Sequence, residues 1–304
     1  MREAIALVRK VFEDLASGKA QNQPRRRLVL PTGSAMHMLA GAFGDYFGTK
    51  FYSTHPKQGA HFHLMLYDAG DARPLALFEA NYLGQIRTGA ASGFATDLLA
   101  APEAETLAVI GTGFQARSQL EAMLAVRRFR SVRVWSRRAE SREQFVRECA
   151  ALDTATDVAI EAAASAEAAV RGADVIVTAT TSREPVLEAE WVSPGAHINA
   201  VGSNNHKRRE LPSALIESAG LIAVDSLEQA RIESGDLILA LDDAGWRNPK
   251  LVELSALAAG THAWSRGSAP TIFKSNGLGV QDVAAAGFVY NARRERETGR
   301  TAIF

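Results

Sequence analysis

The chain has 304 residues, which is enough for two domains or for one large core with a lobe attached. Lysine and arginine together number 34, and so do aspartate and glutamate, so no overall charge attracts nucleic acid or anionic lipid. Basic runs are local, at residues 25–27 and 207–209. We therefore expect no nucleic-acid partner and no membrane partner.

Residues 2–16 carry charged side chains on one face and apolar side chains near the other, which is typical of an amphipathic helix. No signal-peptide core and no membrane-spanning stretch follows, so we expect a cytoplasmic protein. The single cysteine, Cys149, rules out an internal disulfide. It lies in a helical pattern and is expected to be a small core residue rather than a nucleophile.

Before residue 101 the pattern predicts strands joined by short turns, and hence a mixed or antiparallel sheet. The predicted strands cover residues 27–31, 49–54, 62–69 and 73–80. From Thr106 onward strands alternate with alanine-rich helical segments, which is typical of a parallel, doubly wound sheet. These strands are predicted at residues 106–110, 132–135, 174–180, 197–201, 221–225 and 271–274.

The predicted fold class is therefore α/β, with a Rossmann doubly wound parallel sheet and a second, smaller α+β lobe. The first crossover between the two is expected at residues 101–105. A last helical pattern covers residues 280–297 and is expected to run back and pack on the first lobe.

A strand-turn-helix motif begins at the apolar run of residues 107–110. Gly111 is expected to make the turn, Gly113 to let the backbone approach a pyrophosphate, and Ala116 to take the third, packing position. Phosphate then lies at a helix N-terminus. G-x-G-x-x-A alone is a weak signal, because glycines open many strand-to-helix turns. The flanking strand and helix patterns strengthen the prediction of a dinucleotide-binding βαβ unit.

The next strand ends at Ser136, Arg137 and Arg138. An acidic residue at this place would accept hydrogen bonds from the ribose 2′-hydroxyl of NAD, whereas a serine and two arginines favour a 2′-phosphate. The motif therefore predicts NADPH as the preferred cofactor. The alternative is a solvated arginine pair at the start of a surface helix.

Residues 85–100 place a lone arginine, Arg87, at the start of a helix of mostly small residues. Small residues permit close approach to another helix or to a cofactor, and Arg87 would face whatever lies there. The alternative is a tight dimer helix with Arg87 as a surface charge. Lys50 lies in an apolar strand pattern, where an ammonium is costly without a partner. The alternative is that Lys50 is an exposed strand residue.

His61 and His63 lie on one face of a predicted strand and could bind a metal. No carboxylate or cysteine stands at ligand spacing, so we expect no metal site. No zinc signature, P-loop or GxSxG elbow occurs in the chain.

Five motifs, taken in order and spacing, resemble the ornithine cyclodeaminase and mu-crystallin family. They are IRTGAASGFATDLLA, VIGTGFQA, NAVGSNNHKRREL, AVDSLEQARIESGDL and TIFKSNGLGVQDVAAAGFVY, and the match runs from about Gln23 to about Tyr290. The resemblance implies a Rossmann domain, residues 101–280, inserted into a substrate and dimerisation lobe of residues 1–100 plus 281–304. It also implies a homodimer, and a small imino or amino acid as substrate.

Site residues also follow from this resemblance. Arg26 matches the family's carboxylate-holding arginine by its spacing from Pro24, with Arg25 and Arg27 left open. Lys50 and Arg87 match catalytic, substrate-pocket residues beside the nicotinamide. The implied cofactor-binding residues are Arg87, Thr88, Gly111, Thr112, Gly113, Phe114, Gln115, Ser136, Arg137, Arg138, Thr180, Val201, Ser203, Lys274 and Ser275.

The chain departs from the family at Asn204, which follows Gly202 and Ser203 where cyclodeaminases carry an aspartate for proton transfer. Asparagine cannot act as a general base. We therefore expect an NAD(P)H-dependent reductase of small or cyclic ketimines, with NADPH preferred and NAD as a second cofactor. The alternatives are an ornithine cyclodeaminase and a mu-crystallin-like protein that binds NADPH without turnover.

Overall fold

The structure is a computed structural model, and it describes residues 1–295. The chain forms two compact units. The larger unit holds residues 1–9 and 88–277, and the smaller unit holds residues 10–87 and, of the described residues, 278–295. The domain boundaries expected after residues 100 and 280 stay a prediction, and residues 296–304 of the expected lobe lie outside the described part of the chain.

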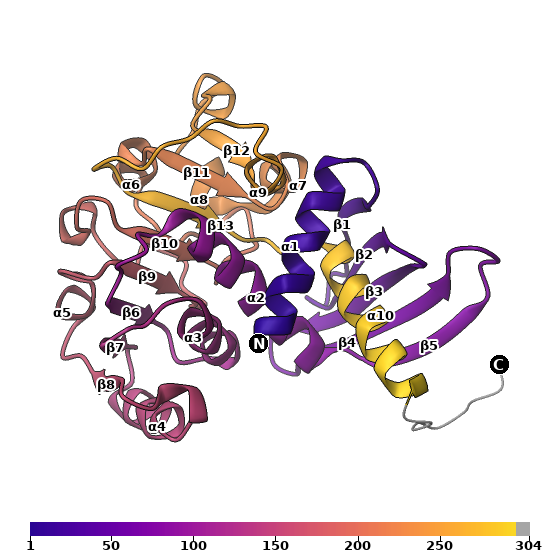
Figure 1. Cartoon of the computed structure of the whole chain (residues 1–304), viewed down its shortest axis with the longest axis horizontal. Coiled ribbons are helices and arrows are strands. Elements are labelled where there is room, and N and C mark those ends of the chain that lie inside the picture. The colour runs from indigo at the N-terminus through magenta and orange to yellow at the C-terminus, as the bar shows by residue number, and fades with distance from the viewer. Residues whose placement is uncertain (296–304) are drawn as a thin grey trace. The chain divides into compact units, whose positions relative to one another are not determined.

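An eight-stranded sheet with all neighbours parallel forms the centre of the larger unit (Figure 1). Its order is β12-β11-β13-β10-β9-β6-β7-β8. The strands are β6 (Thr106–Ile110), β7 (Ser131–Trp135), β8 (Ala159–Ala162), β9 (Val175–Thr178), β10 (His197–Ala200), β11 (Leu221–Val224), β12 (Leu251–Glu253) and β13 (Thr271–Lys274). The predicted Rossmann sheet is confirmed.

The strand order reverses at β6, which lies between β7 and β9. In open parallel sheets, ligands bind beyond the carboxyl ends of the strands at such a switch point. The residues that follow β6, β7, β9 and β10 are therefore where a dinucleotide is expected. Every residue of β9, β10, β11 and β13 is buried, as in a parallel sheet with both faces covered.

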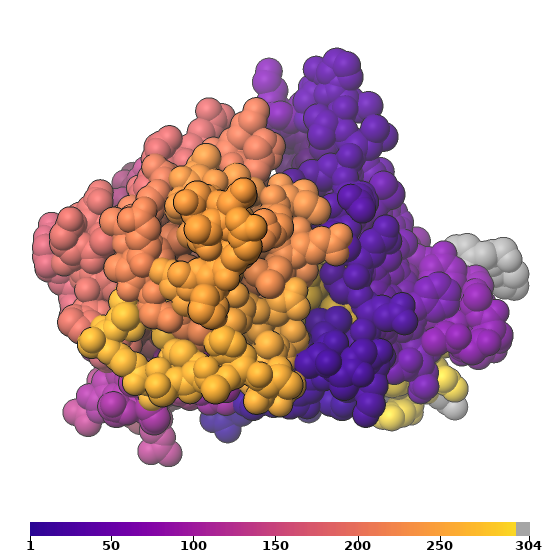
Figure 2. Space-filling view, turned by 90° about the horizontal axis from the view of Figure 1, so that it is seen from above, coloured from indigo at the N-terminus to yellow at the C-terminus, as the bar shows by residue number. Residues whose placement is uncertain are grey.

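Helices connect the strands of the larger unit. They are α3 (Phe114–Val126), α4 (Ala139–Ala150), α5 (Ala166–Val170), α6 (Ser213–Ser218), α7 (Leu227–Glu233), α8 (Gly235–Ile238) and α9 (Leu254–Ala258), with 3-10 turns at Asp153–Ala155, Ala189–Trp191 and Gly245–Arg247. Figure 2 shows the face of this unit on which the orange part of the chain lies at the surface. No helix among residues 1–295 is long and apolar enough to cross a bilayer.

Two helices begin in one unit and end in the other along the chain. They are α1 (Arg2–Ala16), which confirms the predicted amphipathic helix, and α2 (Asn81–Leu99). The boundary within α2 falls between Arg87 and Thr88.

The smaller unit is a five-stranded antiparallel sheet in the order β1-β2-β3-β4-β5. Its strands are β1 (Gln21–Val29), β2 (Ala35–Phe43), β3 (Tyr46–His55), β4 (Gly59–Asp68) and β5 (Pro74–Glu79). Helix α10 (Gly279–Glu295) packs on one face of this sheet (Figure 1). Val283 and Ala286 of the helix meet Leu64 and Leu66 of the sheet in a buried cluster. The predicted return of the last helix to the first lobe is confirmed for its described residues.

Close approach of α10 depends on glycine in the sheet. A Cβ atom on Gly41 of β2 would lie 2.5 Å from the backbone of Val280, and one on Gly279 would lie 2.8 Å from the carbonyl oxygen of Ala40. Both contacts are shorter than real Cβ atoms make, so glycine at these places lets helix and strand touch through their backbones.

Candidate active site

The loop after β6 has the shape that a pyrophosphate requires. Gly111 has φ +114°, and a Cβ atom there would lie 2.3 Å from the carbonyl oxygen of Ala179, so this turn admits only glycine. A Cβ atom on Gly113 would meet no atom within 4 Å, so space is open above that backbone. Helix α3 begins at Phe114 without a side-chain cap, and a helix N-terminus at this place is where a dinucleotide fold receives a phosphate. Ala116 is fully buried, as its packing role requires.

The turn after β7 meets the turn after β6. The Thr112 hydroxyl donates to Oγ of Ser136 over 3.1 Å, and Nη1 of Arg142 donates to the Ser136 carbonyl oxygen over 2.6 Å. Arg137 and Arg138 follow with exposed side chains. No carboxylate occurs from Ser136 to Arg138, so the structure presents serine and arginine where the adenosine ribose is expected.

A buried carboxylate, Glu210, holds the loops that follow β9 and β10. Its Oε1 accepts from the Thr180 N–H over 2.7 Å, and its Oε2 accepts from the Gly202 N–H over 2.7 Å. The Thr178 hydroxyl also donates to Oε2 over 3.0 Å. Burial raises the pKa of Glu210, while the charge of Lys274 and the Thr180 N–H act in the opposite direction. Glu210 thereby fixes the backbone of Thr180 and of the stretch from Val201 to Ser203.

Lys274 at the end of β13 is fully buried, and its ammonium lies 3.1 Å from Oδ2 of Asp236. It also donates to the carbonyl oxygens of Ser203 over 2.6 Å and Ala200 over 3.3 Å. Ser275 donates its hydroxyl to Oδ2 of Asp225 over 3.1 Å. Both side chains are therefore engaged inside the larger unit, and a cofactor contact from these two positions would come from the backbone.

These loops fit a dinucleotide. The open space above Gly113 and the uncapped start of α3 suit the pyrophosphate, and the turn from Ser136 to Arg138 suits a phosphorylated adenosine ribose. The remaining predicted cofactor residues stand as follows: Thr88 and Ser203 are buried, Thr112, Gln115, Thr180 and Val201 are partly buried, and Phe114 is exposed. Their contacts with a cofactor stay a prediction.

A separate cluster of charges lies inside the smaller unit. Nζ of Lys50 on β3 and Nε of Arg87 on α2 each lie 3.0 Å from Oδ1 of Asp282 on α10. Nη1 of Arg87 also donates to Oε1 of Gln281 over 3.1 Å. All four residues are at least nine-tenths buried. The alternatives from the sequence, an exposed strand lysine and a surface arginine, are wrong.

Burial and the neighbouring charges set the protonation of this cluster. Burial and the charges of Arg87 and Arg25 lower the pKa of Lys50, whereas Asp282 raises it; burial is the largest of these effects. The net result is a pKa of about 8. Burial opposes ionisation of Asp282, but Arg87 and Lys50 outweigh this effect and lower the pKa of the carboxyl. Lys50 therefore changes charge within an ordinary pH range, as a proton donor should.

The structure brings Arg25 rather than Arg26 to this cluster. Residues directly opposite in a sheet share a face, and Arg26 is opposite Met38, one residue before Leu39, which pairs with Lys50. Arg26 is therefore on the other face, with an exposed side chain. An irregularity in β1 between Gln23 and Arg26 places Arg25 beside Leu39 instead, where it is 5% exposed and lowers the pKa of Lys50. The choice of Arg26 by spacing from Pro24 does not fit this geometry.

The sequence pattern predicts residues 280–297 as a packing helix and does not single out Gln281 and Asp282 as site residues. A signal was present, because two adjacent polar residues stand in a stretch of small apolar ones on a helix expected to be buried, and such residues need partners.

Other candidates from the sequence do not form sites in the described part of the chain. The ring of His63 stacks on Phe51, with centroids 5.7 Å apart, and residues 1–295 hold no cluster of histidine, cysteine or acidic residues suited to a metal. Cys149 is buried, and burial raises the pKa of its thiol to about 11, which does not suit a nucleophile.

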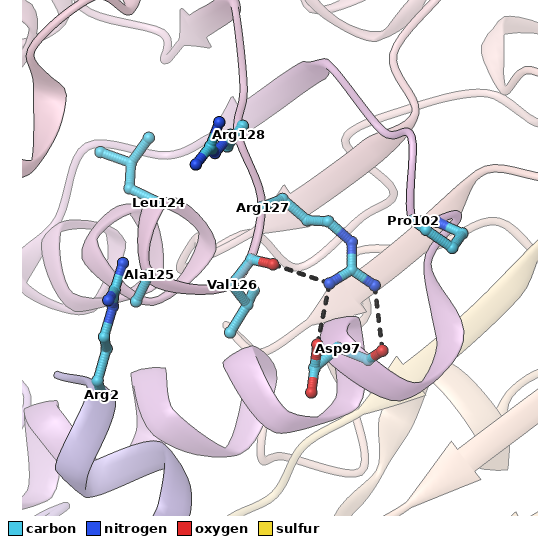
Figure 3. Close-up of a pocket in the computed structure, with 8 residues that line it drawn as sticks. All are labelled: Arg2, Asp97, Pro102, Leu124, Ala125, Val126, Arg127 and Arg128. Atoms are coloured by element: carbon cyan, nitrogen blue, oxygen red, sulfur yellow. Dashed lines mark hydrogen bonds and ion pairs between the residues drawn. The ribbon is translucent and has the colours of Figure 1, made fainter.

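A pocket of about 540 Å³ at the end of α2 is lined in part by Asp97, Arg127 and Arg128 (Figure 3). Arg127 donates to the carboxylate of Asp97 over 3.0 Å and to the carbonyl oxygens of Thr96 and Ala100, each over 3.1 Å. It therefore satisfies the last turn of α2, and none of the predicted site residues lines this pocket.

Comparison with known proteins shows the family to which the chain belongs. Residues 1–297 match the model of the ornithine cyclodeaminase/mu-crystallin family. The ketimine reductase mu-crystallin of Mus musculus is 37% identical over 245 residues, which cover 80% of this chain and 74% of that protein.

Two solved structures share the whole fold. One is the delta(1)-pyrroline-2-carboxylate reductase of Thermococcus litoralis in complex with NADH and L-proline, with a TM-score of 0.91, 29% identity, and coverage of 99% of this chain and 95% of that one. The other is an archaeal alanine dehydrogenase dimer with bound NAD, with a TM-score of 0.91, 31% identity, and coverage of 100% and 94%.

The Rossmann unit and the buried cluster of cations, seen with these relatives, define the class of protein: an NAD(P)-dependent oxidoreductase. More narrowly, the chain belongs to the ornithine cyclodeaminase/mu-crystallin family, which confirms the resemblance read from its motifs.

Proposed function

We propose that this protein reduces the C=N bond of small or cyclic imino acids, with NADPH as the preferred reductant and NADH as a second one. The observation that carries the proposal is the buried cluster in which Lys50 and Arg87 share one carboxylate oxygen of Asp282. Two of the named similar proteins, a ketimine reductase and a pyrroline-2-carboxylate reductase, reduce C=N bonds.

The cations divide the work of binding and proton transfer. Arg25 and Arg87 hold the substrate carboxylate, since guanidinium groups can bind both of its oxygens and so fix its orientation. Lys50 gives a proton to the imine nitrogen. Bound reduced nicotinamide supplies the hydride that the imine carbon accepts. One hydride and one proton convert the imine to the amine, and Lys50 takes its proton back from solvent.

Cofactor recognition falls to the larger unit. Gly111, Gly113 and the first turn of α3 hold the pyrophosphate, and Glu210 keeps the loops after β9 and β10 in place. Arg137 and Arg138 pair with a 2′-phosphate, which is the basis for a preference for NADPH.

We also propose that the protein is a homodimer and acts in the cytoplasm. Apolar side chains lie exposed on the face of the antiparallel sheet opposite α10: Leu28 is 59% exposed, Met38 45% and Leu77 52%. Apolar side chains exposed on one face of a sheet favour association, and the archaeal relative is a dimer. Light scattering on the purified protein tests this, and a monomer at micromolar concentration would contradict it.

Neither alternative has a supporting observation of equal weight. Cyclodeamination needs a base near the amine, and the loop after β10 offers Asn204. A protein that only binds NADPH has no need of a buried Lys50 beside Arg87 and Asp282, because burial of such charges is costly.

The test is a panel assay. The protein is mixed with NADPH and a set of cyclic imino acids, and with 2-oxo acids plus amines, and the nicotinamide absorbance is followed. We expect NADPH oxidation with at least one cyclic imino acid and none with the same substrates in a Lys50→Met variant. Absence of turnover across the panel, with NADPH bound, would support the binding-protein alternative.

A further inference from the structure

Asp282 stands at the centre of the buried cluster. It is fully buried on α10, and its Oδ1 accepts from both Lys50 and Arg87 over 3.0 Å. Its Oδ2 is also buried and has no hydrogen-bond partner in the part of the chain that the structure describes. A carboxylate that leaves one oxygen unpaired in a protein interior is costly, so its retention needs a reason other than packing.

We propose that Asp282 is a positioning residue for the imine reduction, which keeps the Lys50 ammonium charged and aimed at the place where the substrate nitrogen is protonated. The inference rests on the proposed function for its chemistry. It adds a residue from the last helix that does not itself touch the reacting atoms.

The charges around Lys50 show why an anion is needed. Lys50 on β3 faces Arg87 from α2, Arg25 from β1 and Asp282 from α10. Among residues 1–295, Asp282 is therefore the sole anion that influences the pKa of Lys50. Without Asp282, three buried cations would stand together with no anion, and Lys50 is the one able to lose its charge by giving up a proton.

Burial and the two arginines lower the pKa of Lys50, and Asp282 opposes them both by its charge and by its hydrogen bond. Asp282 is thus what holds the pKa near 8 rather than lower, and a lower pKa would leave Lys50 neutral at pH 7.

The contacts around Lys50 also fix the direction in which its ammonium points. An ammonium has three N–H bonds, and Lys50 uses one for Asp282 within residues 1–295, so two are left for a substrate. A Cβ atom on Gly84 would lie 2.7 Å from Nζ of Lys50, so the helix has glycine where the ammonium lies against it. The ring of Phe62 approaches Nζ to 5.2 Å from its centroid and adds a cation-π contact.

Gln281 does the same for the neighbouring arginine. Its Oε1 accepts from Nη1 of Arg87 over 3.1 Å and from the N–H of Leu278 over 3.2 Å. The consecutive pair Gln281 and Asp282 thus holds two edges of one guanidinium, which orients the rest of Arg87 toward a ligand.

The experiment compares Asp282→Asn, which keeps shape and loses charge, with Asp282→Glu, which keeps the charge. The first readout is the Lys50 pKa in the cofactor-free protein, measured by NMR with isotope-labelled lysine. The chain has seven lysines, and the Lys50 signal is assigned as the one missing from Lys50→Arg. The second readout is the pH profile of kcat for imine reduction.

In Asp282→Asn the Lys50 pKa should fall by at least one pH unit, and the alkaline limb of kcat should move to lower pH by the same amount. A fall of one unit leaves about half of Lys50 protonated at pH 7, so there we expect a loss of kcat of about twofold or more, which recovers at pH 6. Asp282→Glu should restore most of the pKa. Asp68→Asn removes one acid from the exposed turn of the same unit and serves as the matched control, with an unchanged profile.

An unchanged Lys50 pKa in folded Asp282→Asn would overturn the inference, and so would a uniform drop in kcat at all pH values. If Asp282→Asn does not fold, Arg87→Gln tests how the neighbouring charges set the Lys50 pKa. Loss of the Arg87 cation should raise this pKa, whereas loss of the Asp282 anion should lower it. A fall in Arg87→Gln would then overturn the inference. The NMR readout needs no turnover, so its failure is distinguishable from a failure of the proposed reaction, which the wild-type panel assay reports.

Discussion

Lys50 and Asp282 are 232 residues apart in the chain, and Nζ of the first lies 3.0 Å from Oδ1 of the second. Arg87 reaches the same oxygen over the same distance from a third element. The antiparallel sheet, α2 and α10 therefore all contribute residues to the cluster. Its activity should depend on charges that lie far apart in the sequence.

The first prediction concerns pH. Lys50 has its pKa lowered to about 8, so it carries the proton it must donate below that pH and loses it above. We expect kcat for imine reduction to fall as the pH rises through about 8. Initial rates between pH 5.5 and 10 with saturating substrate measure this. In Lys50→Arg the limb should vanish together with most of the activity, since arginine does not titrate in this range.

The second prediction concerns Arg87→Lys. The substitution keeps the charge but loses the fork that reaches both Asp282 and Gln281. We expect a loss of about 1 to 3 kcal/mol in transition-state stabilisation. That is roughly 5- to 160-fold in kcat/KM. An unchanged kcat/KM, with NADPH affinity also unchanged, would remove Arg87 from the site.

The third prediction separates two adjacent arginines. Arg25→Met should raise KM for the imino acid at least 10-fold, because a cation facing the substrate carboxylate is lost. Arg26→Met, on the opposite face of the sheet, should change kcat/KM less than twofold. The pair is matched in residue type and net charge. The reverse order of effects would restore the assignment made by spacing from Pro24.

The fourth prediction concerns the cofactor. NADPH should bind more tightly than NADH, because Arg137 and Arg138 stand where an acid would read the ribose hydroxyls. In Arg137→Ala/Arg138→Ala the affinity for NADPH should fall about 10-fold or more and that for NADH should not change. Fluorescence titration measures both. Equal or tighter binding of NADH by the unmodified protein would contradict the prediction.

The fifth prediction is that the protein does not convert ornithine to proline. Asn204 supplies no titratable group near the amine, whereas a preformed imine needs an anchored carboxylate, a hydride and one proton. Incubation of ornithine with catalytic NADP+ or NAD+, followed by analysis for ammonia and proline, provides the test. Robust turnover would favour the cyclodeaminase alternative. Asn204→Asp should leave imine reduction in place.

Much of the fold was predictable from local pattern. The six strands predicted after residue 106 all exist, because a buried parallel strand is a short apolar run between turn residues. The strands β8 and β12 were not predicted. They lie at the two edges of the sheet and are four and three residues long. No residue of β8 is buried, and the buried apolar residues of β12 number only two, Leu251 and Val252.

Strand β2 was also missed, and here the reason lies in packing. Its sequence contains Gly41, and a glycine inside a strand argues against one when read alone. The structure needs that glycine because the backbone of Val280 lies against it. The same limit applies to the cluster. Lys50 and Arg87 were found through resemblance, whereas the partnership with Asp282 depends on how α10 lies on the sheet, which no local pattern specifies.

The irregularity in β1 decides which of the neighbouring arginines points to the Lys50 side of the sheet, because successive side chains of a strand point to opposite faces. Regular pairing continued from Gln23 opposite Ala40 would place Arg26 opposite His37, on the Lys50 side of the sheet. One extra residue in β1 reverses odd and even, and Arg25 faces inward instead. In a relative with a run of basic residues after this proline, the presence or absence of the extra residue in the strand therefore decides which arginine faces inward. Counting from the proline selects the wrong arginine when two proteins differ in that extra residue.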